Sequence, residues 1–193
     1  MPTSRTRSAA VATLMVIAVA PAIPSSSFLS ELDGLTIRAA TAAAVTANAA
    51  AAAEKVSAYR RSRGLGPVTV DPQLTAIAAR HANAMAKRNK MAHVLFGEFS
   101  FAARLSAGGY RAEVAVENIA AGPTDLDQAI AAWKKSPQHN ANLLDSRVES
   151  IGIAVAHTDR GKYREFWSLV LAAPDKRAVA DGAEAPATTD PAQ

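Results

Sequence analysis

Apolar side chains recur every three or four residues over the segment that follows Asp71-Pro72. Leu74, Ile77 and Met85 fall on one stripe, which indicates an amphipathic helix that runs to about Asn89. Asp71 is suited to cap the helix, and the proline fits its first turn. Upstream, the composition of residues 43–63 predicts another helix, because Gly64 and then Pro67 follow it.

Shorter helices are predicted in the middle of the chain. Residues 99–107 form one helix that Gly108-Gly109 ends. Thr124 opens a second, because an acidic residue three positions later gives a capping-box-like pattern. Ser136-Pro137 begins a short helical turn with the serine as its cap. The intervening residues 110–123 show no clear period and are predicted to be irregular.

The pattern changes to that of strands near the C-terminal end. Residues 151–157 are apolar on both faces and rich in β-branched side chains, as in a covered strand. Residues 159–162 resemble a turn, and residues 163–172 form a second strand, so we predict a hairpin. Residues 68–70 are a candidate short edge strand. Helices followed by an antiparallel hairpin predict an α+β fold with helices on the sheet.

The two ends of the chain differ from this domain. Residues 1–22 combine Arg5 and Arg7 with an apolar run at 9–20, which predicts a signal peptide cleaved after Ala22; an uncleaved anchor or an alanine-rich tail is the alternative. We expect an Ala/Ser-rich lead-in over 23–42, the domain over 43–173, and a disordered tail over 174–193. The expected localisation is therefore periplasmic or extracellular, with no transmembrane segment in the mature chain.

Composition narrows the classes of function. The 193 residues include 46 alanines and no cysteine, which excludes disulfide frameworks, cysteine-ligated zinc, iron–sulfur clusters and thiol catalysis. The formal charge of +4 is scattered, so nucleic acid is not an expected partner. No glycine-rich phosphate loop and no serine-nucleophile motif is present, and no catalytic residue is assigned.

Histidines are the best candidates for chemistry. His81 lies in the apolar stripe and is interpreted as a core residue, while His93 and His139 lie at predicted element ends, where side chains can converge on a cleft. With Glu117 from the irregular stretch, these two histidines form a candidate Zn²⁺ site with an open position for water. The three positions are 24 and 22 residues apart, and no short metal motif joins them, so spacing alone leaves this hypothesis open.

Six segments, in order, resemble bacterial members of the CAP superfamily, whose SCP domains occur in cysteine-rich secretory proteins, insect venom antigens and plant pathogenesis-related proteins. The resemblance runs from about Glu54 to Ala172. It is carried by A-Y-R-x-x-x-G-L at 58–65 with D-P-x-L at 71–74, H-A-x-x-M-A at 81–86, E-N-I at 117–119, W-x-x-S-P-x-H-x-x-N-L-L at 133–144, I-G-I-A at 151–154 and F-W-S at 166–168.

The resemblance implies a three-layer α-β-α sandwich with a small antiparallel sheet. It also implies a cavity that two histidines and two glutamates line in many members, able to bind a divalent metal such as zinc. His93, Glu117 and His139 match three of these places, and Ser136 stands where the second glutamate would be. The missing carboxylate puts metal affinity in question.

Three functions remain open at this point. The favoured one is an exported, non-enzymatic module that binds lipid, another small apolar ligand or an envelope protein. The second is a zinc-assisted hydrolase of peptides or cell-wall material, with Zn²⁺ on His93 and His139 and with Glu117 as base or third ligand. The third is a purely structural interaction module in which a buried Glu–His hydrogen bond supports the fold. Ligand identity and oligomeric state are not predicted.

Overall fold

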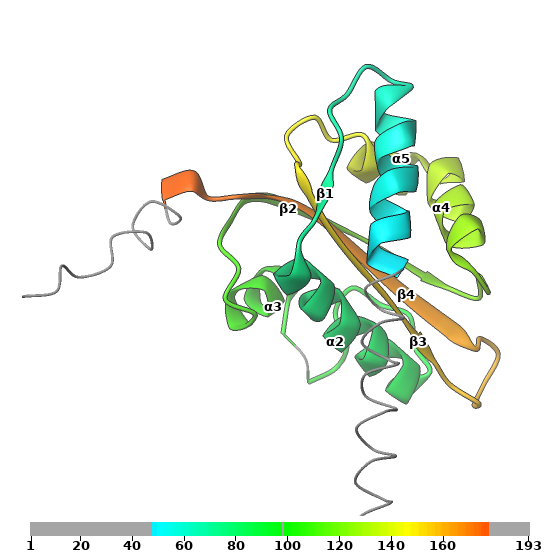
Figure 1. The fold of residues 1–193 in the computed structure, drawn as a ribbon. Coiled ribbons are helices and arrows are strands. Elements are labelled where there is room, and N and C mark those ends of the chain that lie inside the picture. The colour runs from blue at the N-terminus through cyan, green and yellow to red at the C-terminus, as the bar shows by residue number, and fades with distance from the viewer. Residues whose placement is uncertain (1–47, 98, 178–193) are drawn as a thin grey trace, which may run out of the picture. The chain divides into compact units, whose positions relative to one another are not determined.

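The computed structural model describes residues 48–97 and 99–177, which form a four-stranded sheet between two layers of helices (Figure 1). The strands are β1 (Thr69–Val70), β2 (Ala112–Ala121), β3 (Ser150–His157) and β4 (Glu165–Pro174). The sheet order is β1-β3-β4-β2. The predicted α+β three-layer sandwich is confirmed. The predicted signal peptide and lead-in, and all but the first four residues of the predicted tail, lie outside the described residues.

The sheet is mixed rather than purely antiparallel. β3 and β4 form the predicted antiparallel hairpin, and β2 pairs antiparallel with β4 along its whole length. The short β1 runs parallel to β3, with Thr69 opposite Ser150. The parallel pair is possible because a long connection, which contains most of the domain, separates the two strands.

The prediction that residues 110–123 are irregular was wrong, because they include the ten-residue strand β2. Its register against β4 runs from Ala112 opposite Pro174 to Ala121 opposite Phe166, with one irregularity after Ala112. Alanine, glutamate and asparagine are poor strand formers, so the segment lacks the usual strand composition. Pairing with a distant strand overrides that weak local preference.

The helices follow the sequence prediction closely. Residues 48–61 are helical, and α2 (Pro72–Arg88) begins where expected. The Asp71 carboxylate accepts hydrogen bonds from the backbone nitrogens of Gln73 and Leu74, at 2.7 and 3.0 Å. Asn89 ends α2 in the left-handed conformation. The N-terminal cap of this helix is therefore built by the residue that the sequence indicated.

The three shorter helices are α3 (Phe101–Ala107), α4 (Leu126–Lys135) and α5 (Pro137–Leu143). Asp125, not Thr124, caps α4, because its carboxylate accepts from the backbone nitrogen of Gln128 at 2.8 Å. Ser136 occupies the N-cap position of α5, but its side chain makes no capping hydrogen bond.

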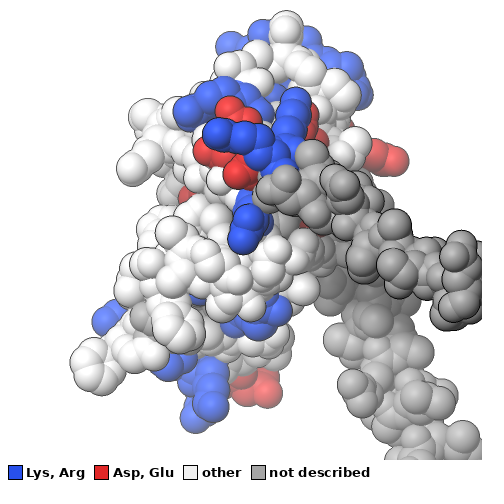
Figure 2. Space-filling view, turned by 90° about the vertical axis from the view of Figure 1, so that its left-hand side faces the viewer, with Lys and Arg blue, Asp and Glu red and all other residues white. Residues whose placement is uncertain are grey.

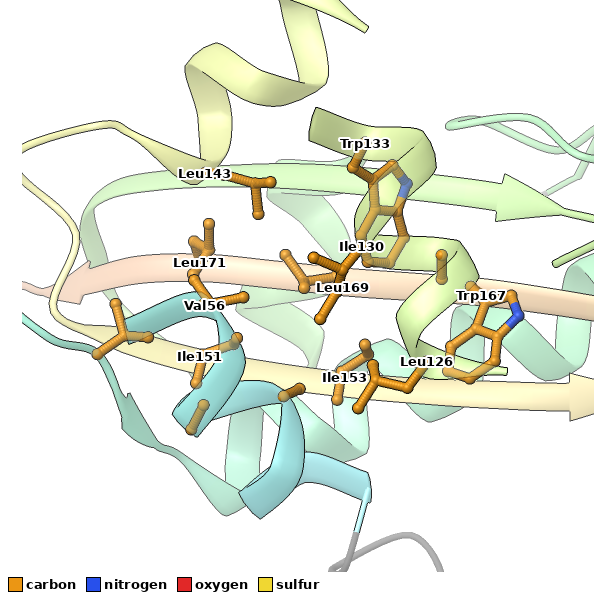
Figure 3. Close-up of a cluster of buried hydrophobic side chains, with 14 of the residues drawn as sticks. Val56, Leu126, Ile130, Trp133, Leu143, Ile151, Ile153, Trp167, Leu169 and Leu171 are labelled. Atoms are coloured by element: carbon orange, nitrogen blue, oxygen red, sulfur yellow. The ribbon is translucent and has the colours of Figure 1, made fainter. Parts of the chain in front are cut away.

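Each face of the sheet carries its own apolar cluster. On one face, the helix of residues 48–61 and α4 pack on β3 and β4. Figure 3 shows Ile130 and Trp133 of α4 above Leu169 and Leu171 of β4. On the other face, α2 packs against β3 and β4 through Leu74, Ile77 and Met85. No described helix is long and apolar enough to cross a membrane.

Candidate functional site

Glu117 and Asn118 are neighbours in β2, and their side chains lie on opposite faces of the sheet. Successive strand side chains alternate, so Glu117 points into the layer of α2 and α3, while Asn118 points toward α5. Both are buried. β2 is an edge strand, so groups from both helical layers can approach each other around it.

The Glu117 carboxylate is held on both oxygens. The guanidinium of Arg104, in α3, donates to Oε1 at 2.8 Å and to Oε2 at 2.9 Å. Nδ1 of His93 donates to Oε2 at 3.0 Å, and the Ser168 hydroxyl of β4 donates to Oε1 at 3.4 Å. The two parallel hydrogen bonds between the Arg104 guanidinium and the Glu117 carboxylate fix the positions of both side chains.

These partners keep Glu117 ionised. Burial would raise the pKa of this carboxyl, but the hydrogen bonds from His93 and Arg104, with the charges of Arg104 and His81, lower it to about 2. A carboxylate with so low a pKa is a weak base, far from the near-neutral value that suits a general base.

The same side chains hold the segment between α2 and α3. Nη2 of Arg104 also donates to the backbone oxygen of His93 at 3.0 Å. Nε2 of the buried His81 donates to the backbone oxygen of Ala92 at 3.1 Å and lies 4.0 Å from Glu117. The buried Leu95 adds an apolar anchor. The Glu117 cluster (Glu117, Arg104, His93 and His81) therefore fixes residues 92–95.

On the other side of β2, Asn118 positions the second histidine. Its side-chain nitrogen donates to the backbone oxygen of His139 at 3.0 Å, and its oxygen accepts from Asn142 at 2.8 Å. His139 and Asn142 are three residues apart and so share one side of α5. Burial, followed by the charge of His93, lowers the pKa of His139, which favours its neutral form.

The structure thus places three of the four predicted cavity residues around β2, with Glu117 and His93 on one side and His139 on the other. Glu117 and His93 are in contact, and the charge of His93 contributes to the lowered pKa of His139. Ser136 lies at the junction of α4 and α5, and no hydrogen bond among the described residues joins its side chain to these three.

The donor set does not fit a resident three-ligand zinc ion. Both Glu117 oxygens accept from Arg104, so a metal bound there would lie next to a guanidinium charge. In residues 48–97 and 99–177, no three His, Asp or Glu side chains are arranged to hold a metal ion. The two imidazoles alone are fewer ligands than a catalytic zinc site uses.

A pocket of about 410 Å³ opens beside the Glu117 cluster. Ile77, Arg80 and His81 of α2 form one wall; Phe99, Arg104 and Ala107 form the other. The lining is mainly apolar. Arg80 has no ion pair in the described part of the chain, whereas Arg104 is paired with Glu117. Among the described residues, the pocket therefore has an apolar body and one cation without an ion pair.

Sequence reasoning did not find Arg104, Ser168 or Arg80 as site residues. Arg104 lies 13 positions from Glu117, and Ser168 lies 51 positions from it. No periodicity connects these residues. The one available signal for Arg104 was a basic side chain in a short helix that is otherwise small and apolar.

Comparison with known sequences finds a match to the model of the CAP, or cysteine-rich secretory protein, family over residues 53–171. The uncharacterized protein YkwD of Bacillus subtilis (strain 168) is 28% identical over 100 residues, which are 52% of this chain and 39% of that protein. The chain therefore spans well under half the length of this curated relative.

Two solved structures have a similar fold. An extracellular protein containing an SCP domain from Bacillus anthracis str. Ames gives a TM-score of 0.58 at 24% identity, over 66% of this chain and 40% of that one. An outer surface protein from Borrelia burgdorferi gives a TM-score of 0.57 at 20% identity, over 63% of this chain and 89% of that one.

Proposed function

The chain belongs to the cysteine-rich secretory protein (CAP) family, and on that premise we propose that it is an exported, non-enzymatic binding protein. Its ligand is a small, mainly apolar molecule that carries an anionic group. The ligand binds in the pocket between α2 and α3, with its apolar part against Ile77 and Phe99 and its anion at Arg80.

The pocket is the observation that carries this proposal. Its volume lies in the range of small-molecule sites, and such sites combine an apolar lining with a few polar groups. A guanidinium binds a carboxylate or phosphate through two hydrogen bonds. Arg80 has no competing carboxylate among the described residues, so a ligand anion would gain an interaction that the protein does not already make.

The Glu117 cluster supports binding over catalysis. The carboxylate that a hydrolase would need as base has a pKa of about 2 and donors on both oxygens. Its contacts instead fix residues 92–95, in the segment between α2 and α3. Glu117 and its partners thus have a structural role that requires no bound metal.

Export rests on the N-terminal pattern and on relatives. Residues 1–22 have the basic start and short apolar run of a signal peptide. Structural relatives include a protein described as extracellular and one described as an outer surface protein. The proposed place of action is outside the cytoplasm.

Calorimetric titration with decanoate and, separately, 1-decanol tests the proposal. Decanoate should bind at least tenfold more tightly, the gain expected from one charged hydrogen-bonded pair. Arg80→Ala should remove this preference, and Arg61→Ala, an exposed arginine in the helix of residues 48–61, should keep it. Absence of decanoate binding, or equal losses in both variants, would overturn the proposal. Zinc-dependent peptide hydrolysis lost in His93→Ala would favour the hydrolase.

A further inference from the structure

Large apolar side chains are exposed together in the segment between α2 and α3. Six such side chains are exposed among the described residues, and four of them belong to residues 91–99. Their exposed fractions are 50% for Met91, 56% for Val94, 97% for Phe96 and 67% for Phe99. We call these four the apolar loop. Such a concentration of exposed apolar surface marks an interaction site.

Hydrogen bonds and one buried side chain attach the segment of the apolar loop to the domain. Leu95, between two exposed residues, is buried in the core, and the backbone oxygens of Ala92 and His93 accept from His81 and Arg104. The backbone of residues 92–95, in the middle of this segment, is therefore fixed. A preorganised surface loses less conformational freedom when it binds.

The surroundings of the apolar loop are basic. From Pro72 to Ala107 the sequence has five Lys or Arg residues and one acidic residue, Glu98, which lies outside the described residues. The next segment, 108–150, has the opposite balance, with six acidic and four basic residues. The part of the chain that carries the apolar loop therefore has a net positive charge.

Most of this charge is available to a partner. Arg80, Lys87 and Lys90 are exposed, and no carboxylate in the described part of the chain pairs with them. Asn89, at the end of α2, donates to the backbone oxygen of Arg160, so the basic β3–β4 turn lies beside these lysines. Tyr163, another exposed large side chain, follows that turn.

The side of the molecule on which α3 lies has separate charged and uncharged areas (Figure 2). Side chains of both signs gather in its upper part. A broad uncharged area lies below them, with charged side chains of both signs, mostly Lys and Arg, at its lower margin. Apolar surface next to positive charge is complementary to an anionic bilayer, whose headgroups attract the cations while its interface accepts the apolar side chains.

We infer that the apolar loop and the basic residues around it, Arg80, Lys87 and Lys90, dock this protein on a membrane of anionic phospholipid. Phe96 and Phe99 enter the interfacial region, and the cations contact the headgroups. This contact does not require a ligand in the pocket, so it goes beyond the function proposed above.

Vesicle binding of the full chain tests the inference. The parent should partition more strongly onto phosphatidylcholine vesicles with 30% phosphatidylglycerol than onto phosphatidylcholine alone, and added salt should weaken the binding. A Phe96→Ser/Phe99→Ser variant should bind at least tenfold more weakly. A Lys87→Ala/Lys90→Ala variant should lose about fivefold for each lysine.

Every variant retains residues 1–47, so any contribution of that segment to vesicle binding is the same in the variants and in the matched controls. Val70→Ser and Arg61→Ala/Arg63→Ala change exposed apolar and basic side chains elsewhere and should leave partitioning unchanged. Emission of a Phe96→Trp variant should be quenched by brominated phospholipid beyond the parent's level, whereas that of Val70→Trp should not. Partitioning that survives Phe96→Ser/Phe99→Ser, or that falls equally in the controls, would overturn the inference.

Discussion

Glu117 shows how the partners of one residue decide what it can do. A buried carboxylate without partners would take up a proton, but Arg104 and His93 stabilise its charge. The residue that the sequence suggested as a metal ligand or base therefore serves first as an anchor for the segment after α2. Its energetic contribution should depend on pH in a direction that follows from its lowered pKa.

Glu117→Gln should lower the free energy of unfolding by about 3 kcal/mol at pH 7, which corresponds to a pKa lowered from 4.5 to about 2. Because the folded pKa is below the unfolded one, this stabilisation is complete above pH 4.5 and is lost as the pH falls toward 2. Urea unfolding at pH 7, 4 and 2.5 measures the free energy of unfolding of the parent and of the variant. Glu113→Gln, an exposed carboxylate of the same strand, is the control. A difference in the free energy of unfolding between the parent and Glu117→Gln that does not change with pH would contradict the lowered pKa of Glu117.

Arg104→Lys should loosen the segment it holds, because an ammonium group cannot make the two parallel bonds to Glu117 and also reach the His93 oxygen. Amide hydrogen exchange of residues 92–95 should become at least tenfold faster, while exchange in α4 stays the same. Unchanged exchange in 92–95 would show that Leu95 and His81 suffice to fix the segment.

At the scale of elements, α2 lies very close to the sheet. A Cβ at Gly152 of β3 would collide with backbone atoms of Leu74 and Thr75 near the start of α2. Glycine is required there by the approach of two backbones, not by an unusual φ. That approach places His81 and Arg80 beside β2 and the pocket.

Gly152→Ala should therefore destabilise the fold by about 2 kcal/mol or more, since backbone cannot move aside as a side chain can. Gly66→Ala is the matched control, because a Cβ there meets nothing within 4 Å. Thermal unfolding of both variants provides the comparison. Equal melting temperatures of the two variants would show that the backbone of α2 does not approach Gly152 closely enough to exclude a Cβ.

The elements also show what the sequence could predict. The bounds of α2 followed from Asp71 and Asn89, because caps act within one helical turn. β2 could not be found this way, since its strand pairing depends on β4, about 50 residues later. The same limit applies to the site: Glu117 and His93 were candidates from residue type and position and then from a family resemblance, whereas Arg104 is apparent only once α3 lies against β2.

For the whole molecule, Arg60 joins the first helix to the far end of the domain. Its buried guanidinium donates to the backbone oxygens of Gly66, Leu143, Asp145 and Val148. Burial, partly offset by the charge of Asp145, lowers the pKa of Arg60. One side chain thus connects the helix of residues 48–61 with the segment that leads from α5 to β3.

Arg60→Met should cost about 3 kcal/mol of stability or more, because it leaves several buried carbonyl groups without a donor. Arg61→Met, an exposed neighbour in the same helix, should cost less than 0.5 kcal/mol, a typical value for surface sites (about ±0.5). Chemical denaturation of both variants measures the two losses of stability. Similar losses in the two variants would mean that the hydrogen bonds of Arg60 contribute little.

The function proposed for this protein requires that the pocket between α2 and α3 binds an amphipathic anion. The most direct test is a two-dimensional NMR titration of the isotope-labelled protein with decanoate. We expect the largest amide shift changes at Ile77, Arg80, Phe99 and Arg104, which line the pocket. Largest changes in α4 and α5, or no change at saturating decanoate, would contradict it.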